Sequence, residues 1–243
     1  MTGKRLAHIA VAELGKLRTL PVAVMTTVGT AVIGALVAAA LTAQLVDHGL
    51  PASAAAVTAQ AVPFLQIGLI LLGVLPMSHE HDGGQLRTTL TAVPRRGLLL
   101  AGKSIATLLC LALAASAAVG GVVAATALTG RLLDAPPAED VAGQPVVGAA
   151  GYLVVVGLLA HAVALLVRSL IPALVGTLSL VLIVSPLLAG LTRHARWLPD
   201  RAARELYDPT DAVLTAATGT LVMLAWIALV GGIAAVLFVR RDP

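Results

Sequence analysis

Charged and aromatic side chains are scarce in this 243-residue chain. Asp, Glu, Lys and Arg make up 12% of it, whereas an ordinary soluble domain has about 25%. Only 2% of the residues are aromatic, and 58% are hydrophobic. This is more apolar sequence than the core of a soluble domain of this size can bury, so the remaining apolar residues must face lipid. The composition predicts an integral membrane protein whose helices pack through Ala, Val, Leu and Gly.

A single cysteine, Cys110, excludes an intramolecular disulfide bond. The net charge of +4 and the pI near 9.8 would on their own suit a nucleic-acid-binding protein. The basic residues, however, stand beside long apolar segments, as residues that flank membrane spans do. We therefore expect a lipid membrane as partner, and no nucleic acid.

Six apolar segments are long enough to cross a membrane, which takes about 20 residues. They predict spans at residues 20–46, 61–79, 98–128, 146–167, 170–191 and 213–239. The chain, 1–243, is then a single all-α transmembrane domain. The first apolar segment is longer than that of a cleaved leader and follows a charged helical stretch, so we expect it to remain as a span.

The charged residues predict which side of the membrane each loop faces. If both termini are inside, the inner segments hold 11 Lys and Arg residues and the outer segments hold 5. The acidic residues run the other way, with 4 inside and 8 outside. Because basic residues are retained in cytoplasmic loops, we predict a multi-pass protein of the cell membrane with both termini cytoplasmic. The last outer loop, with four arginines, is a local exception.

Residues 3–20 have the pattern of an amphipathic helix. One face would carry Leu6, Ile9, Ala10, Leu14, Leu17 and Leu20, and the other Lys4, Arg5, His8 and Lys16. Pro21 then breaks the helix before the first span. Such a helix is expected to lie in the inner membrane interface as an elbow, and a solvated tail is the alternative. Glu13 falls on the apolar face, so it needs a partner there or access to water.

The outer segment 192–212 has the signals of a short interfacial helix. Asp200 can cap a helix that runs to about Tyr207 and is ended by Pro209. Trp197 and Tyr207 suit the level of the lipid headgroups. A plain solvated loop is an equally good interpretation of this segment.

Residues 97–104 match G-x-x-x-x-G-K-[ST], the motif of phosphate-binding loops. Such a loop follows a buried strand and opens a helix, so that its amides wrap the phosphates. Here TAVPRR precedes Gly97, LLLA fills the motif and an apolar span follows Ser104. We therefore expect no nucleotide cofactor on this chain. Lys103 instead marks the cytoplasmic end of the third span, where its amine would reach the headgroups.

The inner loop at 80–97 reads EHDGGQLRTTLTAVPRRG. Residues 85–93 can form a short helix with Leu86 and Leu90 on one side, and Pro94 stops it. A rigid amphipathic helix between two spans is suited to transmit force from a soluble partner into the membrane helices.

This stretch resembles the inner loop of ABC-2-type transporter permeases. The pattern of this family begins with Glu, which is followed by Gly, an aliphatic residue and a basic residue. Leu, Pro and Arg come next, and a Lys then opens the following span. The matching residues are Glu80, Gly84, Leu86, Arg87, Leu90, Pro94, Arg96 and Lys103. His81 stands where an aromatic residue is usual, and Gln85 where Thr or Ser is usual. The stretch AELGKLRT at 12–19 resembles the elbow of the same family, with Glu13 and Lys16 at matching places.

The resemblance implies the transmembrane subunit of an ATP-driven exporter with no ATPase of its own. A separate soluble ATP-binding subunit would bind ATP, and a second permease half, identical or different, would complete the path. Closure of the ATP-binding subunits would push on the coupling loop 80–97 and on the elbow, and so rearrange the bundles. The resemblance does not identify the cargo.

Other polar residues allow further interpretations. Adjacent ligand types in SHEHD, 78–82, point in different directions, so we expect no metal site there, and Glu80 should pair with a basic residue of the elbow or loop. His161, within a span, is either functional or a neutral histidine bonded to a neighbouring helix. No Ser or Asp partner for it stands at a recognisable spacing. Gln66 either contacts cargo or ties two helices together.

Two other functions are alternatives to an exporter permease. A secondary transporter driven by an ion gradient would need acidic residues or broken helices near the middle of the membrane, and no Asp or Glu lies inside a predicted span. A non-transporting scaffold or sensor has no need of a stiff helix between spans. We therefore predict an ABC-2-type permease that is not itself an enzyme.

Overall fold

The computed structural model describes residues 2–82, 96–136 and 143–240, and the regular elements in these ranges are helices. The predicted all-α class is therefore confirmed. Within these ranges, six helical stretches are long and apolar enough to cross a membrane. They are Pro21–Asp47 (α2), Ala54–Met77 in α3 (Ala54–Asp82), Gly97–Leu132 in α5 (Arg96–Leu132), Gln144–Val167 (α6), Leu170–Leu191 (α7, η1 and α8) and Ala216–Leu237 in α10 (Ala216–Arg240).

The second of these helices begins earlier than its hydrophobicity predicts. α3 starts at Ala54 rather than near residue 61. The hydroxyl of Ser53 accepts a hydrogen bond from the amide of Ala56 (3.2 Å), which satisfies one of the free amides of the first turn. Pro63 therefore lies inside the helix, as Pro76 does. The polar residues Thr58 and Gln60 interrupt the apolar run here, so the sequence alone places the start of the span after them.

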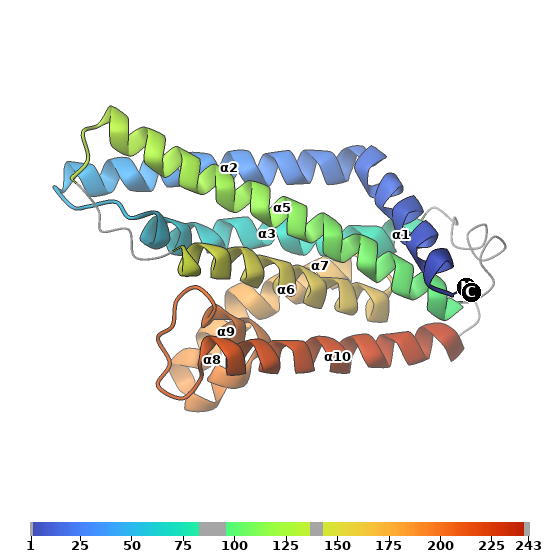
Figure 1. Ribbon diagram of the computed structural model, residues 1–243. Helices are drawn as coiled ribbons and strands as arrows, with labels where there is room; N and C mark the ends of the chain where they lie inside the picture. Colours follow the sequence, from blue (N-terminus) through green and yellow to red (C-terminus); the bar gives the residue numbers. More distant parts are fainter. Residues whose placement is uncertain (1, 83–95, 137–142, 241–243) are drawn as a thin grey trace.

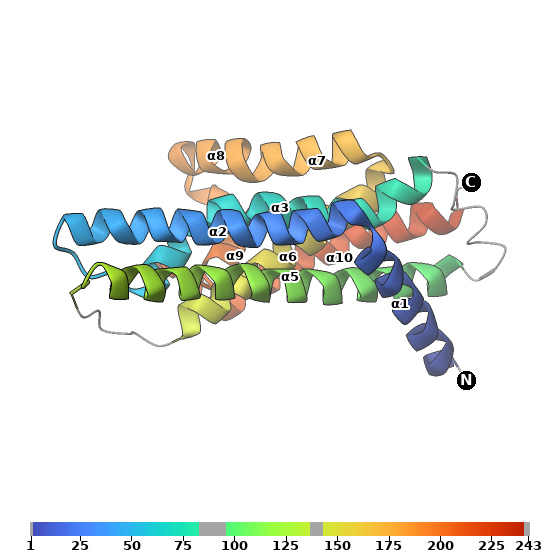
Figure 2. The ribbon, with the colours of Figure 1, turned by 90° about the horizontal axis from the view of Figure 1, so that it is seen from above.

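Two helices form the centre of the bundle. In α3 and α6, 61% and 56% of the most apolar stretch is buried, against 11% in the apolar stretch of α10. α3 packs against α2, α5, α6 and α7, and α6 packs against α3, α5, α7 and α10, an arrangement that Figures 1 and 2 show from two sides. The outer helices keep apolar side chains exposed on their free faces, as helices that meet lipid do.

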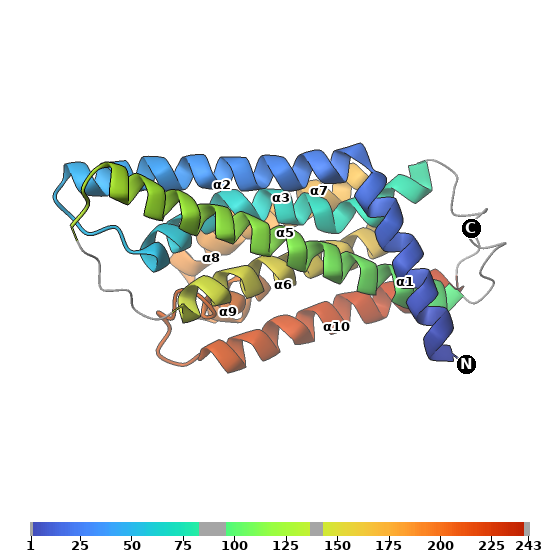
Figure 3. The same ribbon diagram turned by 45° about the horizontal axis from the view of Figure 1, so that its top comes forward.

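The predicted elbow is a helix, α1 (Thr2–Thr19), which crosses the bundle at an angle to the spans (Figure 3). Its apolar face packs on α5, and Ala10, Glu13 and Leu17 are buried there. Leu20 is extended, and Pro21 opens α2 because its missing amide is not needed in a first turn. α1 and the end of α10 lie at the same end of the bundle, which we call the terminal end (Figure 1).

The fifth span is not a regular α-helix. α7 (Leu170–Ser179) passes into a π-helical turn, η1 (Leu180–Val184), and then into α8 (Ser185–Leu191). Pro186, which follows η1, cannot donate the hydrogen bond that a regular helix requires of it. A wider turn before the proline accommodates this loss.

At the end opposite the termini, the outer segment folds as two short helices. They are η2 (Arg193–Trp197), a 3₁₀-helix, and α9 (Pro199–Arg204). The prediction that Asp200 caps the helix is wrong, because the helix starts at Pro199 and Asp200 instead accepts a hydrogen bond from the hydroxyl of Ser185. Tyr207 is buried, and its ring packs against that of Tyr152 with the ring centres 5.0 Å apart, so its headgroup level stays a prediction.

Much of the coupling loop lies outside the described residues. This holds for the helix predicted at 85–93 and for Gly84, Leu86, Arg87, Leu90 and Pro94. Glu80 ends up in the last turns of α3 and Arg96 opens α5, but their side chains are not described. The predicted pairing of Glu80 therefore stays a prediction.

Candidate functional site

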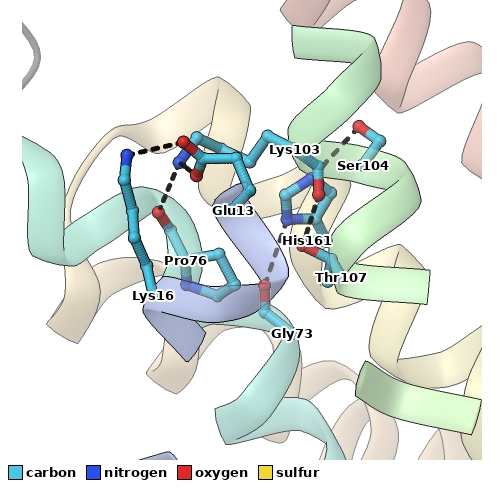
Figure 4. A network of polar contacts seen from close by, with 8 residues as sticks. All are labelled: Glu13, Lys16, Gly73, Pro76, Lys103, Ser104, Thr107 and His161. Carbon is cyan, nitrogen blue, oxygen red and sulfur yellow. Dashed lines mark hydrogen bonds and ion pairs between the residues drawn. The ribbon is translucent and has the colours of Figure 1, made fainter. Parts of the chain in front are cut away.

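A buried ion pair fastens the elbow helix to the bundle. The Nζ of Lys103 on α5 lies 2.8 Å from Oε2 of Glu13 on α1 and 3.3 Å from the carbonyl oxygen of Pro76 on α3 (Figure 4). The side chains of Lys103 and Glu13 are only 4% and 7% exposed. One ammonium group therefore joins three helices at the terminal end of the bundle.

The prediction that Lys103 reaches out to the headgroups is wrong. Its side chain is covered because α1 lies directly over the start of α5. Gly102 permits this close packing, since a Cβ at this position would come within 2.5 Å of the side chain of Ile9. Glu13 thus has, in Lys103, the partner that its place on the apolar face requires.

A second cation acts on the same carboxylate. Lys16, one turn along α1, donates a hydrogen bond of 2.6 Å to Oε1 of Glu13. Burial raises the pKa of Glu13, but the charge of Lys103 and the hydrogen bonds from Lys103 and Lys16 outweigh it and hold this pKa below its ordinary value. Glu13 is therefore a carboxylate at neutral pH and is held by two lysines.

The phosphate-loop motif has a helical backbone in this protein. Residues 97–104 all lie within α5, whereas a phosphate loop turns its free amides towards the ligand. Gly97 is exposed, Gly102 packs against Ile9, and Lys103 holds Glu13. The resemblance to the motif is explained by close packing and an ion pair at the start of a span.

Beside the ion pair, His161 of α6 bridges two other helices. Its Nδ1 lies 3.2 Å from the carbonyl oxygen of Gly73 on α3, and its Nε2 lies 3.3 Å from the hydroxyl of Ser104 on α5. A carbonyl only accepts, so Nδ1 carries the proton and Ser104 donates to Nε2. The sequence offers His161 no serine at a recognisable spacing, and the structure supplies one that lies 57 residues away in the sequence.

The geometry gives this pair a packing role. A nucleophilic serine needs a base that a third group orients, and the group that holds His161 here is a backbone carbonyl. α3 and α6 also touch closely at this level, since a Cβ on Gly73 would overlap the carbonyl oxygen of Gly157. The histidine satisfies polar groups at a close crossing of α3 and α6 in the centre of the bundle.

Further along the same two helices, Gln66 has a partner on α6. The hydroxyl of Tyr152 donates a hydrogen bond of 2.8 Å to Oε1 of Gln66, and both side chains are buried. The sequence allows Gln66 either to contact cargo or to tie two helices together. The bond to Tyr152 is a contact between two helices. Interhelical hydrogen bonds of this kind hold membrane helices in register.

Sequence reasoning could have found part of this network. Lys103 is a lone cation inside an apolar run, and Glu13 is a lone anion on an apolar face, so their pairing follows from the need to neutralise both. Ser104, Tyr152 and Ser185 carry no comparable signal. A hydroxyl inside an apolar helix bonds to its own backbone as readily as to another helix, as Thr107 does to the carbonyl oxygen of Lys103.

No protein-family model matches this chain, and no curated protein matches it. What the findings support directly is therefore a multi-pass, all-helical membrane protein with six candidate spans in its described residues.

Proposed function

We propose that this chain is the transmembrane permease subunit of an ABC-2-type ATP-driven exporter in the cell membrane. It would work with a soluble ATP-binding subunit and a second permease half, and both of its termini would be cytoplasmic. ATP would be bound by the partner and not by this chain.

One observation carries the proposal. Two stretches carry the resemblance to this family, the elbow at 12–19 and the loop that leads into the third span. Their residues Glu13 and Lys103, which are 90 positions apart, form the buried ion pair described above. The parts that a power stroke would have to move are therefore joined mechanically at one end of the bundle.

The mechanism follows from this connection. α5 begins at Arg96, directly after the loop on which the ATP-binding subunit would push. A displacement of the start of α5 would be passed through Lys103 to α1 and, through the Pro76 carbonyl, to α3. Because α3 lies at the centre of the bundle, a small displacement at its end would shift its packing against α6. The ATP-driven step would thus bias two arrangements of one bundle.

The experiment that tests the proposal is reconstitution with the ATP-binding subunit. The tagged chain, isolated from native membranes in mild detergent, should bring down a nucleotide-hydrolysing subunit in stoichiometric amount, and proteoliposomes of the complex should hydrolyse ATP. Leu90→Asp, in the coupling loop, should leave insertion intact and uncouple hydrolysis from transport. Normal coupled transport in this variant would contradict the role given to the loop.

A matched control addresses the phosphate-loop motif. The purified chain without its partner should bind nucleotide only at background level, and Lys103→Ala should leave that level unchanged. ATP binding by the wild-type chain that is lost in Lys103→Ala would place the nucleotide on this chain. Transport that continues after the partner's ATPase is inactivated would instead favour the ion-gradient-driven transporter.

A further inference from the structure

The arginines of the outer segment gather in one pocket. Arg193, Arg196, Arg201 and Arg204 contradict the charge pattern of the other loops, and the structure places all four around a cavity of about 200 Å³ at the end of the bundle opposite the termini. η2, α9, the end of α8 and the segment that leads to α10 enclose it. Four cations are thus gathered at one place by a single segment, whose pocket-lining residues run from Ala189 to Leu214.

The acidic groups near this pocket are already engaged. Asp211 accepts hydrogen bonds from Arg196 (3.1 Å) and from the amides of residues 213 and 214. Asp208 holds Arg204 through contacts of 2.6 and 3.1 Å. Glu205, which is buried, accepts a hydrogen bond from the amide of Asp211. These contacts orient the wall of the pocket and hold its carboxylates in place.

Among the residues that the structure describes, two of the four arginines have no carboxylate in direct contact. Within the described part of the chain, Arg193 and Arg201 form no ion pair with a carboxylate. Arg201 is also half-buried, so part of its hydration has been lost. A half-buried guanidinium group in a concave site, beside a second one, is suited to an anion that offers several oxygen atoms.

The position of the two tryptophans indicates where this pocket lies. Trp197 and Trp226 are the tryptophans of this chain, and the indole nitrogen of Trp226 donates a hydrogen bond of 3.0 Å to the carbonyl oxygen of Trp197. Both rings are partly exposed, at 47% and 38%. Tryptophan concentrates at the boundary between membrane and water. Since Trp197 directly follows Arg196, the pocket lies at the level of the headgroups.

We propose that this pocket binds a phosphate group at the membrane surface, with Arg193 and Arg201 as its principal ligands. The cavity is smaller than the roughly 300–1,000 Å³ that drug-sized ligands occupy, so it admits a single small anionic group rather than a whole amphiphile. The phosphate can belong to a lipid headgroup or to a soluble molecule. The site does not depend on ATP-driven transport.

Native mass spectrometry of the purified full chain tests this site. The lipid probe is dioleoylphosphatidylglycerol, compared with dioleoylglycerol, which has the same acyl chains and no phosphate. The soluble probe is inorganic phosphate, added at constant ionic strength and measured by the rise in unfolding temperature. We expect phosphate-dependent binding of at least one probe, weakened about tenfold or more in Arg201→Gln, because a hydrogen-bonded charged contact is lost. Binding of the lipid alone identifies a headgroup site, and binding of inorganic phosphate identifies a site for soluble phosphates.

Arg131→Gln is the matched control, since it removes one charge from the same end of the bundle outside this pocket. It should bind both probes as the wild-type chain does. If Arg201→Gln unfolds at a lower temperature without ligand, Arg193→Gln, at an exposed position, replaces it. Equal loss in Arg131→Gln, equal binding of the two lipids without any effect of inorganic phosphate, or unchanged affinity in both pocket variants would overturn the proposal.

Discussion

The two ends of the bundle handle charge in opposite ways. At the terminal end, the Glu13–Lys103 pair is almost entirely buried, with 7% and 4% of the side chains exposed. At the other end, the Arg204–Asp208 pair keeps 43% and 32% exposed, and the Arg196–Asp211 pair 24% and 22%. The first pair ties α1 to α5 over a long sequence separation, whereas the others connect residues within one segment.

This difference determines how much stability each end loses when one partner of an ion pair is removed. A buried ion pair offsets the cost of removing two charges from water only while both partners are present, so losing one partner is severe. Exposed pairs are hydrated already and contribute little. The terminal end is therefore fixed by a few irreplaceable contacts, and the other end presents polar groups that are available to a ligand. The predictions below test this contrast, starting from the largest effect.

The largest effect is expected for Lys103→Gln. It removes the buried cation of Glu13 and leaves the carboxylate with the half-exposed Lys16, so we expect a loss of about 3 kcal/mol of the free energy of unfolding, at the low end for a broken buried pair. Denaturant unfolding in detergent, followed by circular dichroism, measures this loss. The double variant Glu13→Gln/Lys103→Gln should recover most of it, because both charges of the buried pair are then gone and Lys16 is half-exposed to water. A double variant as unstable as the single one would show that the charges themselves are not coupled.

The next largest effect is expected at the close contact between α3 and α6. Gly73→Ala places a methyl group against the carbonyl oxygen of Gly157 and should cost about 1–3 kcal/mol, the usual range for overpacking. Gly120→Ala, on α5, is the control, because a Cβ there meets nothing within 4 Å. The control should be neutral or slightly stabilising, since alanine is the better helix former. Equal stability of the two variants would contradict the tight crossing.

A smaller effect is expected from acid. The pKa of Glu13 is lower in the folded protein than its ordinary value of 4.5, so the carboxylate favours folding above that value. This contribution should disappear as the pH falls through the folded-state pKa, below 4.5. The pH dependence of the unfolding free energy should be weaker in Glu13→Gln than in the wild-type chain over this window. Identical pH profiles would mean that Glu13 does not titrate differently in the two states.

The smallest effect is expected for Arg204→Gln. This side chain pairs with Asp208 one turn along, and both are substantially exposed. Pairs of this kind contribute below about 1 kcal/mol, and added salt screens them. Unfolding in low and high salt should therefore separate Arg204→Gln from Lys103→Gln. A loss as large as that of Lys103→Gln would remove the contrast between the two ends.

The sequence was sufficient for the architecture and insufficient for the contacts. Apolar run length predicts six spans because lipid imposes one requirement on every helix that crosses it. The elbow follows from its 3.6-residue periodicity and from Pro21. In contrast, the burial of Lys103 depends on α1 lying over α5, and the partner of His161 depends on which helices surround α6. Neither the burial of Lys103 nor the partner of His161 produces a periodic pattern in the sequence.

The outer segment also has contacts that local sequence rules do not predict. Asp200 stands where a cap is expected by local rules, but its carboxylate is used by Ser185 from a different helix. Burial raises the pKa of Asp200, which the hydrogen bond from Ser185 opposes. Such long-range partners replace local ones wherever a short helix packs against a span, so local capping rules fail there.

Lysine labelling with an amine-reactive reagent tests most directly whether Lys103 fastens the elbow helix to the bundle. The lysines of the chain are Lys4, Lys16 and Lys103, and Lys16 is an internal reference because 49% of its side chain is exposed. In the intact protein, mass spectrometry should find Lys16 modified and Lys103 protected, and Glu13→Gln should make Lys103 reactive. Labelling of Lys103 as fast as that of Lys16 in the wild-type chain would contradict the account.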